Sequence, residues 1–139
     1  MRLITTILAL TLSAAAQAEY GSVTVDEYVR AYDGDTVTVS IHEWPAVIGE
    51  EISVRFRGVD TPEIRASCDA EYEAAIEARD YVRGRMSEAD EIRLERIGRG
   101  SFFRIVADVV IDGEVLADTL IDKGLGVAYE DREDAGWCN

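Results

Sequence analysis

The strongest chemical signal in the chain is a short run in which two arginines precede two carboxylates. Arg55 and Arg57 stand two residues apart, so on a β-strand their side chains point to the same face. Asp60 and Glu63 follow where this strand gives way to a turn at a proline. A guanidinium binds phosphate through a planar fork of donors, and carboxylates hold a hard cation or activate a water. The run therefore has the side chains that hydrolysis of a phosphodiester needs.

Two other segments carry side chains of the same kinds. The turn Asp33-Gly34-Asp35-Thr36 lies between two alternating segments, and Gly34 is free there to adopt a positive φ. Arg104 stands inside a later segment rich in β-branched and aromatic residues. Each segment alone has an ordinary alternative interpretation: a hairpin turn, a helix cap after a strand, or an arginine paired with a neighbouring acid.

The elements that must position these residues follow from periodicity. Alternating apolar residues predict five strands, and one long and one short helical pattern predict two helices. The strands are expected over residues 22–30, 36–41, 52–59, 91–97 and 102–111, and the helices over 68–86 and 116–123. A five-stranded β-barrel with a helix between strands three and four and a short helix after strand five is an α+β layout, that of the OB-fold.

The N-terminus has the pattern of a signal peptide. Arg2 gives a charged start, residues 3–16 are apolar apart from small hydroxyl residues, and Ala16-Gln17-Ala18 fits a cleavage site. A membrane anchor is the alternative, although the run is shorter than the roughly 18 to 20 residues of a spanning helix. We expect cleavage of residues 1–18 and one mature domain over residues 19–139. It should be secreted or periplasmic, monomeric, and free of the membrane.

Two cysteines, Cys68 and Cys138, are present in the whole chain. In an exported protein such a pair first indicates a disulfide, here closing a loop of about 70 residues. Two buried free thiols are an alternative, and a two-cysteine metal site is a weaker one because His42 is the single histidine.

The charge of the chain is strongly negative, with 14 basic and 28 acidic residues and a net charge of −14. Only Arg2 would leave with residues 1–18, so 13 basic and 28 acidic residues would give the mature domain −15. General electrostatic attraction to nucleic acid is therefore excluded. Residues 55–104 hold 10 basic and 11 acidic residues, so any phosphate-binding surface should come from there.

Taken together, the segments resemble the thermonuclease (staphylococcal nuclease-like) family over about residues 25–129. In that family a DGDT turn precedes a strand whose arginine stands five residues before the aspartate of a DTPE turn; here these are Arg55 and Asp60. A second arginine follows the helix, eight residues before an Asp-Gly turn; here these are Arg104 and Asp112-Gly113.

The resemblance implies roles for these positions. A calcium ion would be bound by the carboxylates of Asp35 and Asp60 and the backbone carbonyl of Thr61, with Asp33 acting through water. Glu63 would be the general base, and the phosphate-stabilising pair would be Arg55 and Arg104. The implied activity is calcium-dependent endonucleolytic cleavage of DNA or RNA, so the expected partner is a nucleic-acid substrate.

The chain also departs from the family pattern. Phe102-Phe103 replaces the usual Tyr-Gly, which leaves Phe102 as an aromatic platform for substrate. Tyr129 stands where the family has tyrosines that contact sugar and phosphate, so we expect it to bind substrate as well. Lys123 is the single lysine, so lysine contacts to terminal phosphates are missing. Trp44 and Trp137 could stack on bases, although packing over an edge of the barrel is the stronger expectation for both.

Two other functions remain open on the sequence. The same fold could serve as a non-catalytic module that binds nucleic acid or another ligand. An acidic envelope protein that binds a basic partner is the second alternative. The nuclease interpretation rests on the full set of carboxylates and arginines, which is present here: Asp35, Arg55, Asp60, Glu63 and Arg104.

Overall fold

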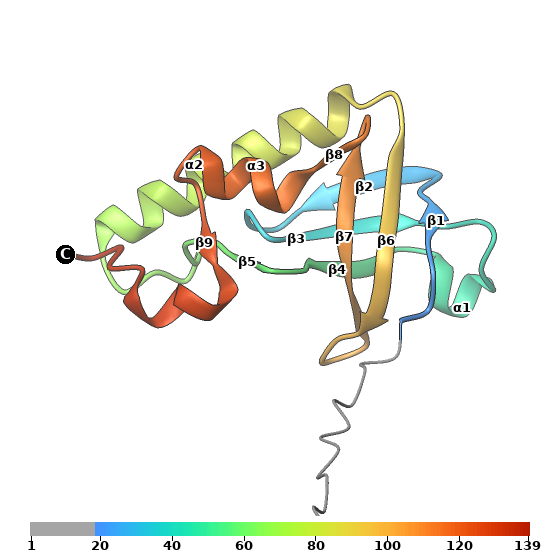
Figure 1. Cartoon of the computed structure of the whole chain (residues 1–139), viewed down its shortest axis with the longest axis horizontal. Helices are drawn as coiled ribbons and strands as arrows, with labels where there is room; N and C mark the ends of the chain where they lie inside the picture. Colours follow the sequence, from blue (N-terminus) through green and yellow to red (C-terminus); the bar gives the residue numbers. More distant parts are fainter. Residues whose placement is uncertain (1–18) are drawn as a thin grey trace, which may run out of the picture.

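A curled sheet flanked by helices makes up residues 19–139, the part of the chain that the structure, a computed structural model, describes (Figure 1). The predicted signal peptide, residues 1–18, lies outside it. The strands are β1 (Val23–Thr24), β2 (Glu27–Ala31), β3 (Thr36–Ser40), β4 (Ile52–Phe56), β5 (Val59–Asp60), β6 (Ile92–Arg99), β7 (Arg104–Ile111), β8 (Glu114–Val115) and β9 (Val127–Ala128). The helices are α1 (Ala46–Gly49), α2 (Asp69–Glu88) and α3 (Leu116–Asp122), and a 3-10 helix covers Tyr129–Asp134.

The first predicted strand is broken in two, and this break closes the sheet into a barrel. The main sheet has the order β1-β6-β7-β4-β3-β2, so the two halves of the first strand lie at its opposite ends. The Val25 N–H donates to Ile92 on β6 (2.9 Å), and the next N–H, of Asp26, donates to Ser40 on β3 (3.0 Å). The segment thus changes partner within one residue, which confirms the predicted OB-fold type of α+β barrel.

Strand β4 lies at the centre of this sheet and brings the distant arginines together. It pairs antiparallel with β3, where Arg55 faces Thr36, and parallel with β7, where Arg55 faces Val106 and Ser53 faces Arg104. Because alternate residues share a face, Arg55 and Arg104 project from the same side of the sheet. The opposite side chains of β4, Ile52, Val54 and Phe56, are buried in the core.

The predicted third strand does not run unbroken to Val59. It turns at Arg57-Gly58, where Gly58 has φ +79°, and then forms the short β5, which pairs with β9 near the C-terminus. Asp60 therefore lies on a separate two-residue strand beside the end of the chain. This break places Asp60 opposite Arg55, which a straight strand would not do.

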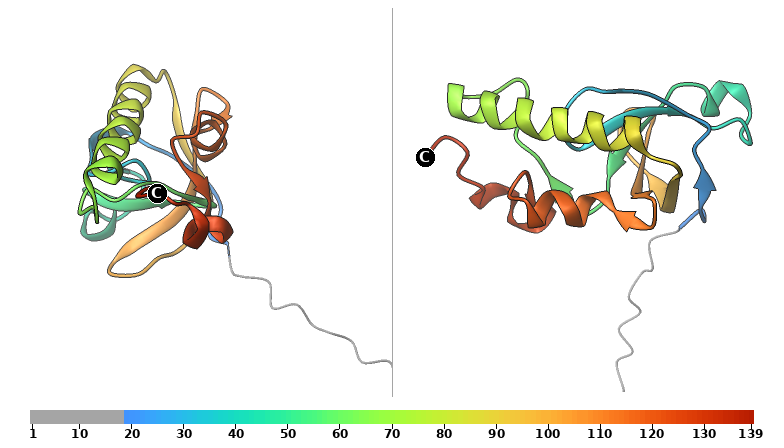
Figure 2. Two further views of the ribbon diagram at one scale, coloured as in Figure 1. Left: turned by 90° about the vertical axis from the view of Figure 1, so that its left-hand side faces the viewer. Right: turned by 90° about the horizontal axis from the view of Figure 1, so that it is seen from above.

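Helix α2 packs against β2, and α3 packs against β7 and β5, so the two helices stand apart in both views of Figure 2. The predicted long helix is confirmed as α2, with Ala75, Ala78, Val82 and Met86 buried, and the predicted short helix is confirmed as α3, followed by Gly124 at φ +71°. No helix within residues 19–139 is both long and apolar enough to cross a membrane.

Gly34 is needed for a different reason than expected. Its φ is not among the positive values of the chain, but an added Cβ would lie 2.7 Å from Cβ of Ala78 and 3.0 Å from the side chain of Thr61. The turn over residues 33–36 thus packs directly against α2. A side chain at this position would push the turn away from the helix.

The last predicted strand begins later than expected. Phe102 and Phe103 precede β7 and form the turn after β6, each with φ +56°. This left-handed conformation cannot belong to a strand and is costly for residues with a Cβ. The connection between β3 and β4, for which the sequence predicts no element, contains a short helix, α1.

Candidate active site

Arg55 joins two of the predicted calcium ligands. Its Nη1 lies 2.8 Å from Oδ2 of Asp35, and its Nη2 lies 3.0 Å from Oδ1 of Asp60. The guanidinium also donates to the backbone carbonyl of Val59 at 3.1 Å. The side chains of Arg55 and Asp35 are 15% and 4% exposed, so this is a largely buried charge network. The two carboxylates thus approach each other from β5 and from the start of β3.

The turn before β3 and the residue after β5 are connected through Asp35. The N–H of Thr61 donates to Oδ2 of Asp35 at 3.1 Å, although the two residues are 26 positions apart. The N–H of Asp35 donates to Oδ1 of Asp33 at 3.2 Å, and the hydroxyl of Thr36 donates to Oδ1 of Asp35 at 3.0 Å. Thr61 is 1% exposed, and its buried hydroxyl has no hydrogen-bond partner among the described residues.

Burial and the charge of neighbouring carboxylates raise the pKa of three acidic side chains of this cluster. Burial, followed by the charge of Asp35, raises the pKa of Asp33 from 3.8 to about 7. Burial and the charge of Asp35 also raise the pKa of Asp60, against the opposing effect of Arg55. The pKa of Glu63 is raised by partial burial and then by Asp35 and Asp60. The single guanidinium of Arg55 therefore does not balance the negative charge gathered here.

A cationic groove of about 1010 Å³ opens beside the acidic cluster. Five arginines and one carboxylate, that of Asp60, line it. The arginines are Arg55, Arg57, Arg99, Arg104 and Arg132. In a chain of net charge −14 such a concentration of guanidinium groups is a local reversal of sign. Arg55 and Arg104, the predicted phosphate-binding pair, both face this groove.

The arginines of the groove differ in how firmly they are held. Arg57 donates to the backbone carbonyl of Arg96, which fixes its orientation. The Nε atoms of Arg57 and Arg104 are buried and have no hydrogen-bond partner among the described residues. A buried donor without a partner is costly, and an anionic ligand that reached it would remove that cost.

The C-terminal segment completes the groove on the side of Arg55. The ring of Tyr129, one of the predicted substrate-binding residues, lies near two guanidinium groups, with its centre 5.9 Å from Cζ of Arg55 and 4.1 Å from Cζ of Arg132. Nη1 of Arg132 also donates to the backbone carbonyl of Tyr129 at 2.7 Å. The sequence reasoning did not identify Arg132. The available signal was that it is the single basic residue after Lys123 in an acidic segment.

Phe102 lies away from these side chains. It is 97% exposed at the tip of the turn between β6 and β7, and among residues 19–139 it does not line the groove. Its role as a substrate platform remains a prediction. Its neighbour Phe103 lines a second hollow next to the groove instead.

Cys68 and Cys138 are joined by a disulfide, the first of the interpretations considered. Within residues 19–139 the sole trio of candidate metal-ligand atoms lying within 4.8 Å of one another is Cys68, Glu71 and Cys138. Because both sulfurs are in the disulfide, this trio is not a metal site. The disulfide instead ties the segment with Tyr129 and Arg132 to the start of α2.

Comparison with known proteins agrees with the geometry of the site. The sequence model of the family described as "Staphylococcal nuclease homologue" matches residues 53–136. The chain is 32% identical over 118 residues to Endonuclease YncB of Bacillus subtilis (strain 168), and the aligned part covers 81% of this chain and 51% of that protein. The chain thus spans about half the length of this relative. The family match covers more than half of the chain, and the chain belongs to the staphylococcal nuclease homologue family.

Proposed function

We propose that the protein is a calcium-dependent endonuclease that hydrolyses phosphodiester bonds of DNA, RNA or both. The observation that carries the proposal is the adjacency of a groove lined by five arginines to a cluster of carboxylates joined through Arg55. The arginines of the groove can bind phosphate, and the carboxylates of the cluster can bind a hard cation. Family membership and the name of the similar Bacillus protein, an endonuclease, support the same reaction class.

The residues present fit a calcium ion. Asp35 and Asp60 offer carboxylate oxygens, and Thr61, whose N–H donates to Asp35, offers a backbone carbonyl; calcium prefers such hard oxygen donors and completes its shell with water. The raised pKa values of Asp33, Asp60 and Glu63 reflect uncompensated negative charge, which a divalent cation would balance. When bound, calcium supplies a positive charge that polarises the phosphate and helps to orient a water.

The side chains of the protein then accept the proton of the water, stabilise the phosphoryl group and hold the nucleotide. Glu63 accepts the proton of the attacking water, and its raised pKa makes it a stronger base than an ordinary glutamate. Arg55 and Arg104 donate to the phosphoryl oxygens as their charge grows, and the buried Nε of Arg104 is a donor without another partner among the described residues. Tyr129 and Arg132 hold the neighbouring nucleotide at the edge of the groove.

The proposal is tested by digestion of plasmid and single-stranded DNA and of RNA with calcium and with a chelator. The wild-type protein should cleave these substrates with calcium but not with the chelator. Glu63→Gln should lower kcat by at least about 100-fold, because loss of the general base costs about 10² to 10⁴ in rate. Glu73→Gln, on the exposed side of α2, is the matched control and should cleave like the wild type.

Equal cleavage by wild type, Glu63→Gln and chelated protein would contradict the proposal. Tight binding of nucleic acid in calcium without cleavage would instead favour a non-catalytic binding module on the same fold. Binding of a basic protein that survives Arg55→Ala would favour an interaction role for the acidic surface.

We further propose that the domain acts as a monomer outside the cytoplasm, after removal of residues 1–18. The disulfide between Cys68 and Cys138 supports an oxidising compartment. Mass spectrometry of protein exported by a bacterial host should give a chain that begins at Glu19. An intact N-terminus in the exported protein would contradict this.

A further inference from the structure

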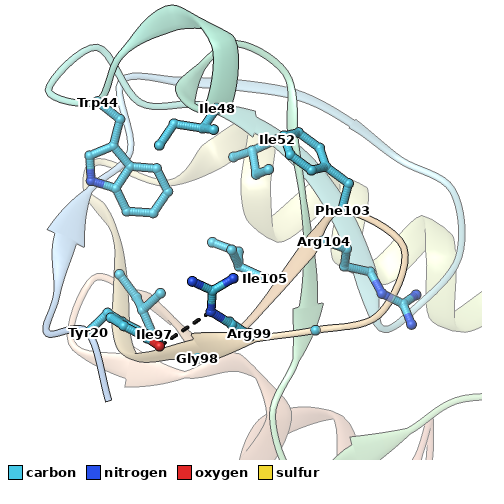
Figure 3. Close-up of a pocket in the computed structure, with 11 residues that line it drawn as sticks. Tyr20, Trp44, Ile48, Ile52, Ile97, Gly98, Arg99, Phe103, Arg104 and Ile105 are labelled. Atoms are coloured by element: carbon cyan, nitrogen blue, oxygen red, sulfur yellow. Dashed lines mark hydrogen bonds between the residues drawn. The ribbon is translucent and has the colours of Figure 1, made fainter. Parts of the chain in front are cut away.

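A second hollow of about 460 Å³ lies beside the cationic groove, next to the turn between β6 and β7 (Figure 3). Trp44 and Ile48 stand on one side of it, and Phe103 projects from the turn between β6 and β7. Ile105 and Ile97 lie deeper, and the hollow is mostly apolar. Trp44 packs against the core with part of its surface, as expected from the sequence, while the rest of the indole lines this hollow.

The hollow and the groove are continuous. Five residues line both of them: Tyr20, Gly98, Arg99, Gly100 and Arg104. Arg104 stands at the shared edge, with its guanidinium directed away from the hollow in Figure 3. A chain bound at the phosphate-binding pair can therefore pass Arg104 and enter the hollow without leaving the protein surface.

The charge at the hollow favours an anionic occupant. The guanidinium of Arg99 faces it and Arg104 stands at its edge, and within residues 19–139 no carboxylate lines it, although the chain carries 28 acidic residues. Nε of Arg99 donates to the hydroxyl of Tyr20 at 3.3 Å, and its Cζ lies 5.8 Å from the centre of that ring. This contact directs the guanidinium over the hollow, as Figure 3 shows. Aromatic faces beside a guanidinium are what a nucleotide base and its phosphate require.

The aromatic turn is kept at a cost to the fold. Phe102 and Phe103 both have φ +56°, yet their side chains are 97% and 74% exposed, so little packing compensates for the left-handed backbone. Strain of this kind persists mainly where a function uses it. The turn holds Phe103 at the rim of the hollow, opposite Trp44.

We propose that this hollow binds unpaired bases of a single-stranded nucleic acid on one side of the cleaved phosphate, an inference that rests on the proposed nuclease function. Bases stack on Trp44 and Phe103, and Arg99 holds the phosphate between them. A base in a duplex has both faces covered by its neighbours, so it cannot occupy the hollow without leaving the stack. The subsite thus selects single strands, of DNA or RNA, longer than the reacting dinucleotide.

The test compares strands of two and eight nucleotides, in DNA and in RNA. Trp44→Ala should lower kcat/KM on the eight-nucleotide strand by about tenfold, the effect of one lost stacking partner. Its effect on the two-nucleotide substrate should be smaller. Phe103→Gly should act in the same direction, and it keeps the test valid if Trp44→Ala is poorly folded, because glycine accepts the backbone of this turn. Val47→Ala, on the short helix α1 that follows Trp44 but outside the hollow, is the control.

Binding is measured separately from cleavage. In Glu63→Gln with Trp137→Phe, Trp44 is the remaining tryptophan, and an eight-nucleotide strand in calcium should quench its fluorescence. An eight-pair duplex should bind about tenfold more weakly. If the strand quenches the fluorescence but the wild-type protein does not cleave it, the nuclease function is contradicted and the subsite is still supported.

Two results would overturn the subsite even if the protein cleaves. One is an equal loss from Trp44→Ala and Phe103→Gly on both strand lengths. The other is Trp44 fluorescence that a saturating single strand leaves unchanged.

Discussion

At the scale of single residues, Arg55 has a second task besides phosphate binding. It balances Asp35 and Asp60 when no metal is bound. Arg55→Ala leaves a 4% exposed carboxylate, that of Asp35, without its ion-pair partner, and breaking a buried pair in this way costs about 3 to 5 kcal/mol. We expect the free energy of unfolding, measured with urea in chelator, to fall by this amount. Calcium should restore part of it, because the cation replaces the lost charge.

The control for Arg55 is a surface ion pair. Arg30 lies 3.7 Å from Glu51, and both side chains are more than half exposed. Arg30→Ala should change the free energy of unfolding by less than about 1 kcal/mol, with or without calcium. If Arg55→Ala were as mild as Arg30→Ala, the network would not be the stabilising contact described above.

The raised pKa of Asp33 predicts how the stability of the fold depends on pH. Its folded pKa of about 7 lies above the usual value of 3.8, so the folded state holds the proton more tightly than the unfolded state. Between about pH 4 and 7 the unfolded state therefore binds fewer protons, and the free energy of unfolding in chelator falls as pH rises. Asp33→Asn keeps an acceptor for the N–H of Asp35 but cannot ionise. It should flatten this slope and stabilise the protein at pH 8 by at most about 4 kcal/mol.

Urea unfolding at pH 5, 6, 7 and 8 checks this prediction. Glu73→Gln removes an exposed charge from α2 and should leave the slope unchanged. Saturating calcium should reduce the difference between Asp33→Asn and the wild type, because the cation favours ionised carboxylates. A wild-type protein that becomes more stable from pH 5 to 8 in chelator would contradict the assignment.

At the scale of elements, the turn between β6 and β7 combines strain with exposure. Phe103→Gly removes a Cβ from a residue at φ +56°, where a left-handed conformation costs about 1 to 2 kcal/mol. Because Phe103 is 74% exposed, little packing is lost. Glycine also gains entropy in the unfolded chain, which offsets part of this relief. We therefore expect the free energy of unfolding to rise by only about 1 kcal/mol. The same variant should bind long single strands more weakly.

Val47→Gly is the comparison for this turn. Val47 is 81% exposed in α1, a helix, so glycine should lower the free energy of unfolding there by about 1 kcal/mol. Opposite signs for the two substitutions are expected in thermal unfolding. A loss of stability in Phe103→Gly would show that the ring packs more tightly than its exposure indicates.

Elements with a clear local pattern were predictable from the sequence. The alternation over residues 36–41 and the helical spacing over 68–86 are local properties, and both appear as β3 and α2. The break at Val25-Asp26 was not predictable in this way, because it depends on pairing with β6 and β3, which lie far along the chain. Gly34 was singled out correctly but explained wrongly, since its neighbours Ala78 and Thr61 come from other elements.

In the candidate site, too, residues with a local spacing were predictable, and a residue placed by long-range pairing was not. Spacing identified Arg55, Asp60 and Arg104, and the fold places all three at one groove. Arg132 has no such spacing, because the pairing of β5 with β9 brings the chain end to the site. Long-range pairing of this kind leaves no periodic signal in the sequence.

At the scale of the whole molecule, the disulfide connects the chain end to the helix beside the site. Replacing Cys68 and Cys138 together with serine removes the cross-link and keeps a helix cap, because Cys68 precedes α2 and its sulfur accepts the N–H of Glu71. Opening a loop with a sequence separation of 70 should cost about 4 kcal/mol. KM should rise more than kcat falls, because Tyr129 and Arg132 become less firmly placed.

Urea unfolding and steady-state kinetics on single-stranded DNA measure the two effects. A reductant should reproduce them in the wild type and leave the double serine variant unchanged. A loss of less than about 1 kcal/mol, or a fall in kcat at constant KM, would contradict the described role of the cross-link.

The net charge of −14 and the cationic groove should affect the salt dependence of nucleic-acid affinity in opposite directions. Phosphate contacts weaken as salt rises, by a slope of about 0.7 in log affinity per contact on a single strand. Repulsion from the acidic remainder is screened over about 10 Å at 0.1 M salt, so it matters mainly at low salt. Neutralising Glu73 and Glu77 on α2, outside the groove, should therefore raise the affinity for an eight-nucleotide strand at low salt and leave it unchanged at high salt.

Arg132→Gln provides the contrast, because it removes a groove arginine rather than a distant acid. Its affinity should be lower throughout, with a salt slope smaller by about 0.7. Fluorescence titrations of Glu63→Gln in calcium at several salt concentrations separate the two behaviours. If both variants changed only the low-salt affinity, the arginine would act as part of the general field, and the groove would make no direct contact with phosphate there. If Arg132→Gln alone changes the slope, the groove binds phosphate locally in spite of the charge of the whole protein.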